Sequence, residues 1–162
     1  MVNQGVKKGS GPLYSPAEKR RRDRSRWTQV QGFLAVFQFA IFALSTALVL
    51  RYLIWSEGWL LATVSVVFKT LVLYTIMITG SLWEKDVFGR YLFAPAFFWE
   101  DVVSMGVLAL HTAYLFAVFS GVLEPHAQML LALVAYGAYV INAAQFVLKL
   151  RMARLQSSEA SA

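Results

Sequence analysis

The residues that could do chemistry in this sequence are ionisable groups placed inside or beside long apolar segments. Lys69 has about ten apolar-type residues on either side, and His111 lies about eleven residues into a later apolar run. Glu100 and Asp101 open that later run, and Glu84 follows the run before it. Because ionisable side chains inside a membrane span are costly, each of these residues is a candidate functional residue.

Each candidate also has a structural interpretation, and the residues alone leave both open. Lys69 is either a structural lysine paired with a carboxylate or a carbonyl, or a functional cation. His111 is a packed core residue, an axial ligand to a magnesium or iron macrocycle, or an acid–base group near neutral pH. Glu100 and Asp101 suit the first turn of a helix through the helix dipole, and Glu84 suits a solvated interface.

Helical spacing places several of these groups together. Glu100 and His111 are eleven residues apart, which at about 100° per residue is close to three full turns, so they share a helix face with Ser104. We expect this polar stripe to point inward from the cytoplasmic side. Glu84 and Glu100 bracket one connection, and two carboxyl groups brought close together favour keeping one protonated, as a general acid requires.

The elements that must position these groups are four apolar helices. Hydrophobic residues make up 58% of the 162 residues and charged residues only 15%, against about 25% charged in ordinary soluble domains. A membrane helix needs about 20 apolar residues, and four such segments occur at about 27–50, 59–82, 99–120 and 127–148. The short turns predict antiparallel neighbours. We therefore predict an all-α protein, an integral membrane up-down four-helix bundle over residues 25–155.

The basic residues predict the orientation of these spans. Eight of the fifteen Lys and Arg residues precede Trp27, and the C-terminal end and the middle connection carry most of the others. The positive-inside rule then places both termini in the cytoplasm. Residues 1–24 are expected to form a basic, flexible cytoplasmic tail on anionic lipid, in which Ser15 and Pro16 begin a short helix. Residues 156–162 form a C-terminal tail.

Several classes of protein are excluded or disfavoured. The chain has no cysteine, which excludes disulfides, zinc–thiolate sites, iron–sulfur clusters and cysteine nucleophiles. No nucleic-acid-binding module accompanies the basic run, so no nucleic-acid partner is expected. A small transporter with Lys69 as its coupling charge is disfavoured, because the sequence has neither the repeated halves nor the paired interrupted helices of such proteins.

An unusual run of residues connects the second and third spans. It comprises Gly80–Lys85, Val87–Gly89 and the aromatic-rich Arg90–Asp101. Other distinctive segments are Trp27–Gly32, Arg51–Leu53, Lys69–Tyr74, Leu108–Leu115, Tyr139–Phe146 and Leu148–Arg151. Together, over roughly residues 14–155, they resemble the vinyl (bacterio)chlorophyllide hydratase family.

The resemblance implies a hydro-lyase of bacteriochlorophyll biosynthesis in a bacterial inner membrane, cytoplasmic or intracytoplasmic. Such an enzyme adds water across the 3-vinyl group of a chlorophyllide or bacteriochlorophyllide to give a 3-(1-hydroxyethyl) group. Protonating the terminal vinyl carbon requires a general acid, and a second group must orient the water. We expect no cofactor and no protein-bound metal, since water is the co-substrate and the magnesium belongs to the substrate.

Chemistry and position together suggest the catalytic roles. Glu100 is assigned as the proton donor, kept protonated by Glu84 or Asp101, and Glu100→Gln is expected to remove turnover. His111 is assigned either as the base that handles water or as a ligand to the substrate magnesium. Lys85 or Arg90 is expected to bind the substrate propionate, or Lys69 if the substrate lies deeper.

The remaining assignments concern the substrate and partners. Trp99, within a dense aromatic run, and Asn142, in the cytoplasmic half of the fourth span, are assigned as substrate contacts. Other enzymes of pigment biosynthesis are further candidate partners. The alternative is a non-catalytic membrane protein that binds or assembles pigment, which would use His111 and the aromatics without needing Glu84 and Glu100.

Overall fold

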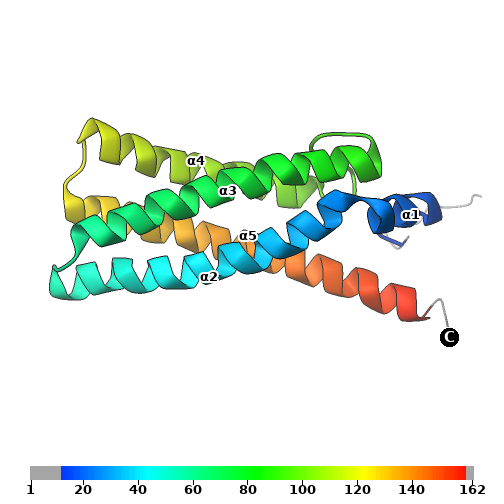
Figure 1. Ribbon diagram of the computed structural model, residues 1–162, viewed down its shortest axis with the longest axis horizontal. Helices are drawn as coiled ribbons and strands as arrows, with labels where there is room; N and C mark the ends of the chain where they lie inside the picture. Colours follow the sequence, from blue (N-terminus) through cyan, green and yellow to red (C-terminus); the bar gives the residue numbers. More distant parts are fainter. Residues whose placement is uncertain (1–11, 160–162) are drawn as a thin grey trace, which may run out of the picture.

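The computed structural model describes residues 12–159, which form five α-helices and, within that range, no strand. The helices are α1 (Pro16–Arg24), α2 (Arg26–Trp55), α3 (Trp59–Phe88), α4 (Phe98–Ser120) and α5 (Pro125–Glu159) (Figure 1). The predicted all-α class is confirmed.

Four of the helices, α2 to α5, are long and apolar enough to cross a membrane, and they define a multi-pass membrane protein. They correspond to the four predicted spans, but three of them extend further, and α2 continues to Trp55. The helix α3 continues to Phe88 and α5 to Glu159, because a helix need not end where its apolar stretch ends. The extension of α3 incorporates Glu84 into a helix.

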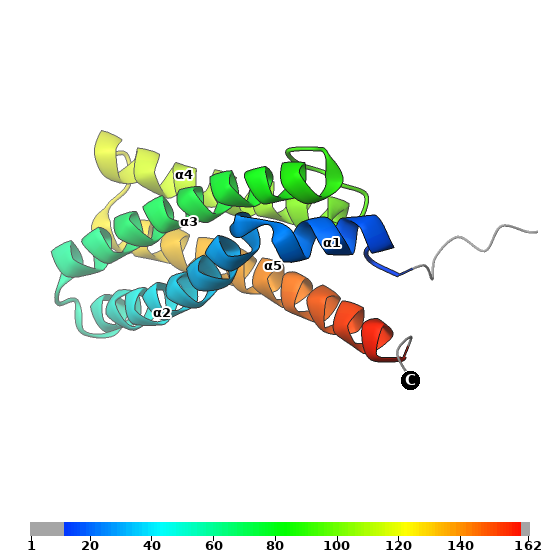
Figure 2. The same ribbon diagram turned by 45° about the vertical axis from the view of Figure 1, so that its right-hand side comes forward.

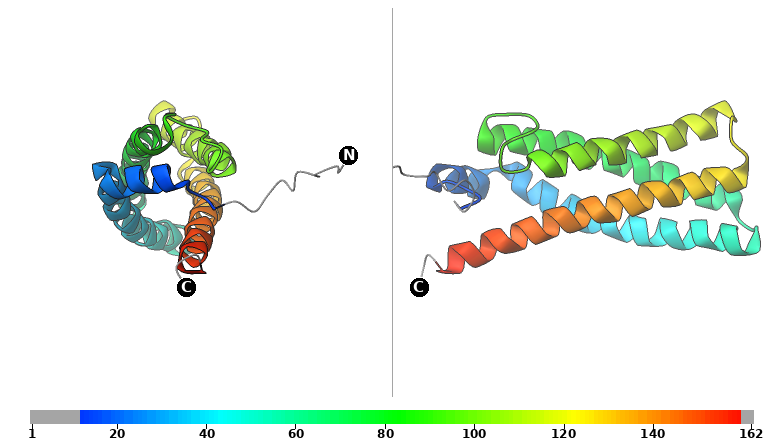
Figure 3. Two further views of the ribbon diagram at one scale, coloured as in Figure 1. Left: turned by 90° about the vertical axis from the view of Figure 1, so that its right-hand side faces the viewer. Right: turned by 180° about the vertical axis from the view of Figure 1, so that it is seen from behind.

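The long helices lie side by side and form two antiparallel hairpins, α2–α3 and α4–α5 (Figures 1 and 2). The turn between α2 and α3 contains Ser56 and Gly58, both with positive φ, and α4 ends at Gly121 with φ 66°. The views in Figure 3 show the helices surrounding a common interior. We call the end with these two turns the turn end. The other end, which holds both termini and the α3–α4 connection, is the terminal end.

Buried apolar clusters occur along the length of the bundle, and buried ionisable groups occur from its middle to the terminal end. The cluster nearest the turn end comprises Val49, Ala62, Val66, Tyr114, Met129, Ala132 and Tyr136. Outward-facing positions are also apolar: Phe119 is 77% exposed and Val36 73%. Large exposed apolar side chains on long helices are suited to contact with lipid.

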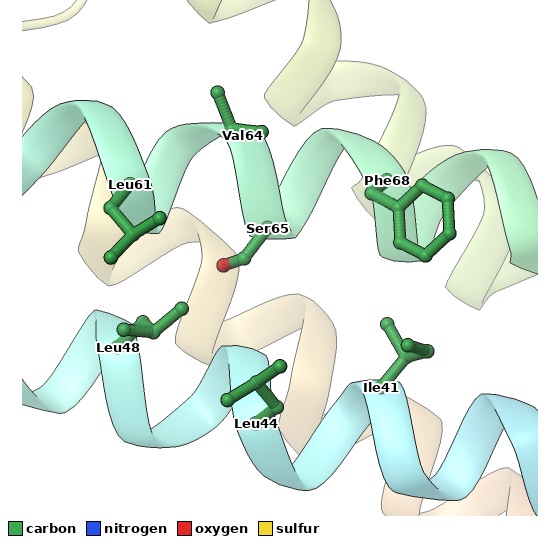
Figure 4. Close-up of a pocket in the computed structure, with 7 residues that line it drawn as sticks. All are labelled: Ile41, Leu44, Leu48, Leu61, Val64, Ser65 and Phe68. Atoms are coloured by element: carbon green, nitrogen blue, oxygen red, sulfur yellow. The ribbon is translucent and has the colours of Figure 1, made fainter.

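A lipid-facing groove of about 240 Å³ runs between α2 and α3 (Figure 4). Apolar side chains line it together with one hydroxyl, that of Ser65. Ser65 Oγ lies 2.8 Å from Ser45 Oγ, which in turn contacts Tyr136 Oη at 2.5 Å. The hydroxyl in the groove is thus already bonded to its neighbours.

The N-terminal segment differs from the flexible tail that we expected, as far as residues 12–24 are concerned. Ser15 caps α1, as predicted, and the structure adds a capping box with Glu18. The segment packs on the terminal end, because Arg21 Nε donates to the Val87 carbonyl at 2.8 Å and Tyr14 stacks on Phe88. Residues 1–11 lie outside the described part of the chain.

Candidate active site

Two carboxyl groups meet at the terminal end, between the end of α3 and the start of α4. Glu84 and Asp101 are 5% and 3% exposed, and their carboxyl groups lie close to each other, because they accept from the consecutive backbone amides of Ala94 and Phe93. Two buried carboxyl groups close together favour keeping one of them protonated. The pair that was expected from Glu84 and Glu100 therefore forms with the neighbouring residue, Asp101.

The same two carboxyl groups hold the α3–α4 connection. Asp101 Oδ2 accepts from the backbone N–H of Phe93 at 2.8 Å, and Glu84 Oε2 accepts from that of Ala94 at 3.1 Å. Phe93 has φ 58°, a left-handed conformation that a bulky residue rarely adopts without such support. The carboxyl pair thus fixes the connection that covers it.

Glu100 is engaged elsewhere. Its Oε2 lies 2.6 Å from Lys149 Nζ of α5, in a partly buried ion pair. Its backbone carbonyl accepts from Asn142 Nδ2 at 2.9 Å and from Ser104 Oγ at 2.8 Å, and Ser104 Oγ also contacts Asn142 Oδ1. The predicted inward stripe of Glu100, Ser104 and His111 is confirmed, since all three side chains are buried.

A second polar centre lies deeper, at Lys69 and His111. Lys69 is fully buried, and its Nζ lies 3.3 Å from His111 Nε2 and 3.9 Å from the centroid of the Tyr139 ring. His111 Nδ1 lies 2.8 Å from the Val107 carbonyl, so this nitrogen carries the proton and Nε2 accepts from Lys69. Within residues 12–159 no carboxylate forms an ion pair with Lys69.

The two centres lie too far apart to act on one atom. Asp101 and His111 are ten residues apart on α4, about 15 Å of helix rise. An apolar layer that includes Leu73 and Val107 separates them. A ligand that met both centres would have to be long or broad.

The other predicted contacts lie at the surface of the terminal end. Trp99 is 69% exposed and packs against Phe98. Lys85 donates to the Gly89 carbonyl at 3.1 Å and lies over the Tyr91 ring, and Arg90 is exposed. These three residues do not join the buried groups.

Sequence reasoning missed Lys149 as a member of the site, because it served only as a positive charge in the orientation count. The available signal was its place at the terminal end of α5, opposite the start of α4 in an antiparallel hairpin. Within the described residues no group of three or more His, Cys, Asp or Glu side chains is placed to hold a metal ion.

The fold and the site together define a multi-pass membrane protein with acid–base groups enclosed at one end of its helices. The model of the 2-vinyl bacteriochlorophyllide hydratase family matches residues 14–152. A protein of that name from Cereibacter sphaeroides is 61% identical over 149 residues, which cover 91% of this chain and 92% of the relative. One from Rhodobacter capsulatus is 58% identical over 151 residues, 93% of this chain and 87% of the relative.

The chain belongs to the 2-vinyl bacteriochlorophyllide hydratase family. The resemblance in the central run and along the helices is thereby confirmed, and membership makes the chain a hydratase, a type of hydro-lyase. No solved structure gives a significant match.

Proposed function

We propose that this chain adds water to the vinyl group of a bacteriochlorophyllide, giving a 1-hydroxyethyl group, and that the Glu84–Asp101 pair is its general acid. The observation that carries the assignment is the placement of these two buried carboxyl groups side by side on the adjacent backbone amides of Phe93 and Ala94. A proton held by one of two buried carboxyl groups is shielded from bulk water, so it is available for transfer to carbon.

The reaction balances with these groups alone. The carboxyl pair gives its proton to the terminal vinyl carbon, forming a C–H bond as the π bond breaks. The positive charge develops on the carbon next to the ring, where the macrocycle delocalises it and the carboxylate left behind stabilises it. Water forms a C–O bond there, and its surplus proton returns to the carboxyl pair. The enzyme ends in its starting state and needs no cofactor, and the magnesium enters and leaves with the substrate.

Glu100 is the less suitable donor because Lys149 neutralises it as a carboxylate at 2.6 Å. In this assignment Glu100 and Lys149 brace α4 against α5. Asn142 completes the brace through the Glu100 carbonyl and Ser104. Asn142 thereby sets the position of the first turn of α4, in which Asp101 lies.

Lys69 is assigned as the anchor for the substrate propionate. It is a buried cation that contacts an imidazole and a tyrosine ring but, within the described residues, no carboxylate. His111 orients the ammonium by accepting one of its protons at Nε2. A flat substrate could then present its vinyl group to the carboxyl pair and its propionate to Lys69. Lys85, Arg90 and Trp99 would meet the pigment earlier, at the entrance.

The proposed setting is a bacterial inner membrane, crossed four times by an up-down bundle of α2 to α5, with both termini in the cytoplasm. The charge distribution supports this orientation, since the terminal end carries most of the Lys and Arg residues. Other enzymes of pigment biosynthesis are proposed partners on that side. The terminal end is called the cytoplasmic end below.

Because the chain has no cysteine, single introduced cysteines report the orientation without background. In intact cells a membrane-impermeant maleimide is expected to label Glu57→Cys in the α2–α3 turn but not Arg154→Cys. Both should be labelled after the cells are opened. Labelling of Arg154→Cys alone in intact cells would reverse the proposed orientation.

The test of the carboxyl pair compares matched variants in membranes from a host that makes no chlorophyll. A bacteriochlorophyllide with a vinyl group is supplied in heavy-oxygen water, and the gain of one labelled water is followed by mass spectrometry. A general acid contributes about 10²–10⁴-fold to rate. We expect Glu84→Gln and Asp101→Asn to lower turnover by that factor and Glu100→Gln to lower it far less.

Pigment binding by each variant, measured by absorption, separates lost chemistry from lost structure. If Glu100→Gln abolishes turnover while Glu84→Gln retains it, the donor is Glu100 and the pair assignment is wrong. Pigment that binds to the unsubstituted protein and is never hydrated would favour a non-catalytic pigment-binding protein.

A further inference from the structure

One buried amide in the membrane interior has no hydrogen-bonding partner. Gln38 of α2 is 1% exposed, and its Oε1 has no partner among the described residues. No hydrogen bond is formed by its Nε2 within the same range. A buried amide that makes no hydrogen bond is unfavourable in an apolar interior. Such an amide is therefore a candidate for binding a ligand.

The neighbouring amides are satisfied. Gln31, seven residues earlier on α2, donates to Thr79 Oγ1 at 2.7 Å across the α2–α3 contact. Asn142 bonds to Ser104 and to the Glu100 carbonyl. Two other amides have an unpartnered oxygen, but Gln145 is only half-buried and Gln128 donates to the Leu123 carbonyl near the turn end. Gln38 is thus distinguished by complete burial without any bond.

Gln38 lies between the two polar centres along the helices. Its face of α2 also carries Ser45 and Val49, which are buried. One turn toward the turn end, Phe42 packs on Tyr139 at 5.0 Å between ring centroids, and Tyr139 faces the Lys69 ammonium. Asn142 lies three residues beyond Tyr139 in the opposite direction, toward the carboxyl pair. The Gln38 side chain is therefore placed inside the bundle, between the proposed propionate anchor and the proposed acid.

We propose that Gln38 Oε1 is the axial ligand of the substrate magnesium. The inference rests on the proposed function, which places the pigment between the two centres. Magnesium is a hard cation that prefers oxygen ligands, including amide carbonyls. In a chlorophyllide four ring nitrogens occupy its equatorial positions, and an axial position is open to one protein oxygen.

The ligand choice follows from what the candidates already bind. Both nitrogens of His111 are engaged, Nδ1 by the Val107 carbonyl and Nε2 by Lys69. Ligation by His111 would therefore break its contact with the Lys69 ammonium. Gln38 loses no bond when it ligates a metal. Ligation of the central magnesium also fixes the position of the macrocycle, while its edges meet Lys69 and the carboxyl pair.

The test measures preference for the metal in lipid nanodiscs containing the full chain. The probes are a magnesium bacteriochlorophyllide and its magnesium-free form, each with an ethyl group in place of the vinyl group so that no hydration occurs. We expect the unsubstituted protein to bind the magnesium form at least tenfold more tightly. Gln38→Leu should bring the two affinities together by weakening the magnesium form alone.

Two further variants complete the design. Gln31→Leu, on the same helix, removes an amide that is already bonded and should leave the metal preference unchanged. Gln38→His supplies a nitrogen ligand and should retain the preference while shifting the absorption of the bound pigment. If Gln38→Leu does not fold, Gln38→His is the deciding variant. The absence of an absorption shift in the pigment that it binds overturns the proposal.

Equal affinity of the unsubstituted protein for the two pigments, or an unchanged preference in Gln38→Leu, also overturns it. Turnover of the vinyl substrate is measured in parallel. Hydration without metal preference would refute the ligand and leave the hydratase intact. Metal preference that depends on Gln38, without any hydration, would refute the hydratase and leave the ligand intact.

Discussion

Replacing Lys69 with methionine is expected to change substrate binding far more than stability. Lysine at the centre of a membrane helix costs about 2.5–3.5 kcal/mol. The ammonium regains about 2 kcal/mol from the Tyr139 ring at 3.9 Å. It regains about 1.5 kcal/mol from His111 Nε2, at the lower end for a charged hydrogen bond because 3.3 Å is long. The cost of placing the lysine there and the energy regained from its two contacts agree to within about 1 kcal/mol.

Lys69→Met is therefore expected to alter the free energy of unfolding by only about 1 kcal/mol. The substrate carboxylate, in contrast, loses a charged hydrogen bond of about 1.5–3 kcal/mol. At 1.4 kcal/mol per factor of ten, this raises KM about 10- to 100-fold. Thermal unfolding in nanodiscs measures the first quantity, and the hydration assay over a range of pigment concentrations measures the second.

A double-mutant cycle in which one change is made in the substrate isolates the contact between Lys69 and the substrate propionate. The methyl ester of the substrate lacks the anionic propionate, so the unsubstituted protein should bind it as weakly as Lys69→Met binds the acid. Lys69→Met should then show no further loss with the ester. Equal KM values for the acid in both proteins, or a further loss with the ester, would refute Lys69 as the propionate anchor. Unfolding of Lys69→Met would refute the energetic balance.

Two predictions concern the segments around the site. Ser15→Ala removes the capping box of α1 and should destabilise that helix by about 1 kcal/mol, seen as faster amide exchange in α1. The Ser15 backbone N–H, which the variant keeps, donates to Glu18 Oε2 at 2.7 Å and holds the pKa of Glu18 below its usual 4.5. The stabilisation from that bond is present at neutral pH in both proteins and is lost as the pH falls through that range. Equal exchange in both proteins at neutral pH would contradict the role of the hydroxyl, which accepts from the Glu18 N–H. Gly89→Ala should cost about 1–2 kcal/mol of stability because Gly89 has φ +80° at the end of α3. Gly106→Ala, with equally open space inside α4, is the control and should not destabilise; similar melting temperatures for the two variants would contradict the role of φ.

Hydropathy and periodicity predicted the helices and the inward face of α4, but not the partners across helices. Glu100 and Asp101 are adjacent, so the sequence offered two carboxylates to Glu84. The choice of Asp101 depends on the path of the connection, whose backbone amides at Phe93 and Ala94 contact the pair.

The contact between Lys69 and His111 could not be predicted from the sequence either. Each residue was identified as an unusual polar group in an apolar run, yet neither run carries information about its register against the other. Gln38 shows the converse limit: it lies seven residues from Gln31 on one face of α2, and nothing in the sequence distinguishes the two amides. Only the packed structure separates the bonded amide from the unbonded one.

The docking of Tyr14 has a consequence for the order of events during synthesis. Its partners include Phe97 as well as Phe88, and Phe97 leaves the ribosome only after α2 and α3 have been made. The basic segment that follows Tyr14 is therefore free of this contact while the first hairpin enters the bilayer. During that interval its arginines can act on topology, and they become part of the folded protein only when the second hairpin arrives.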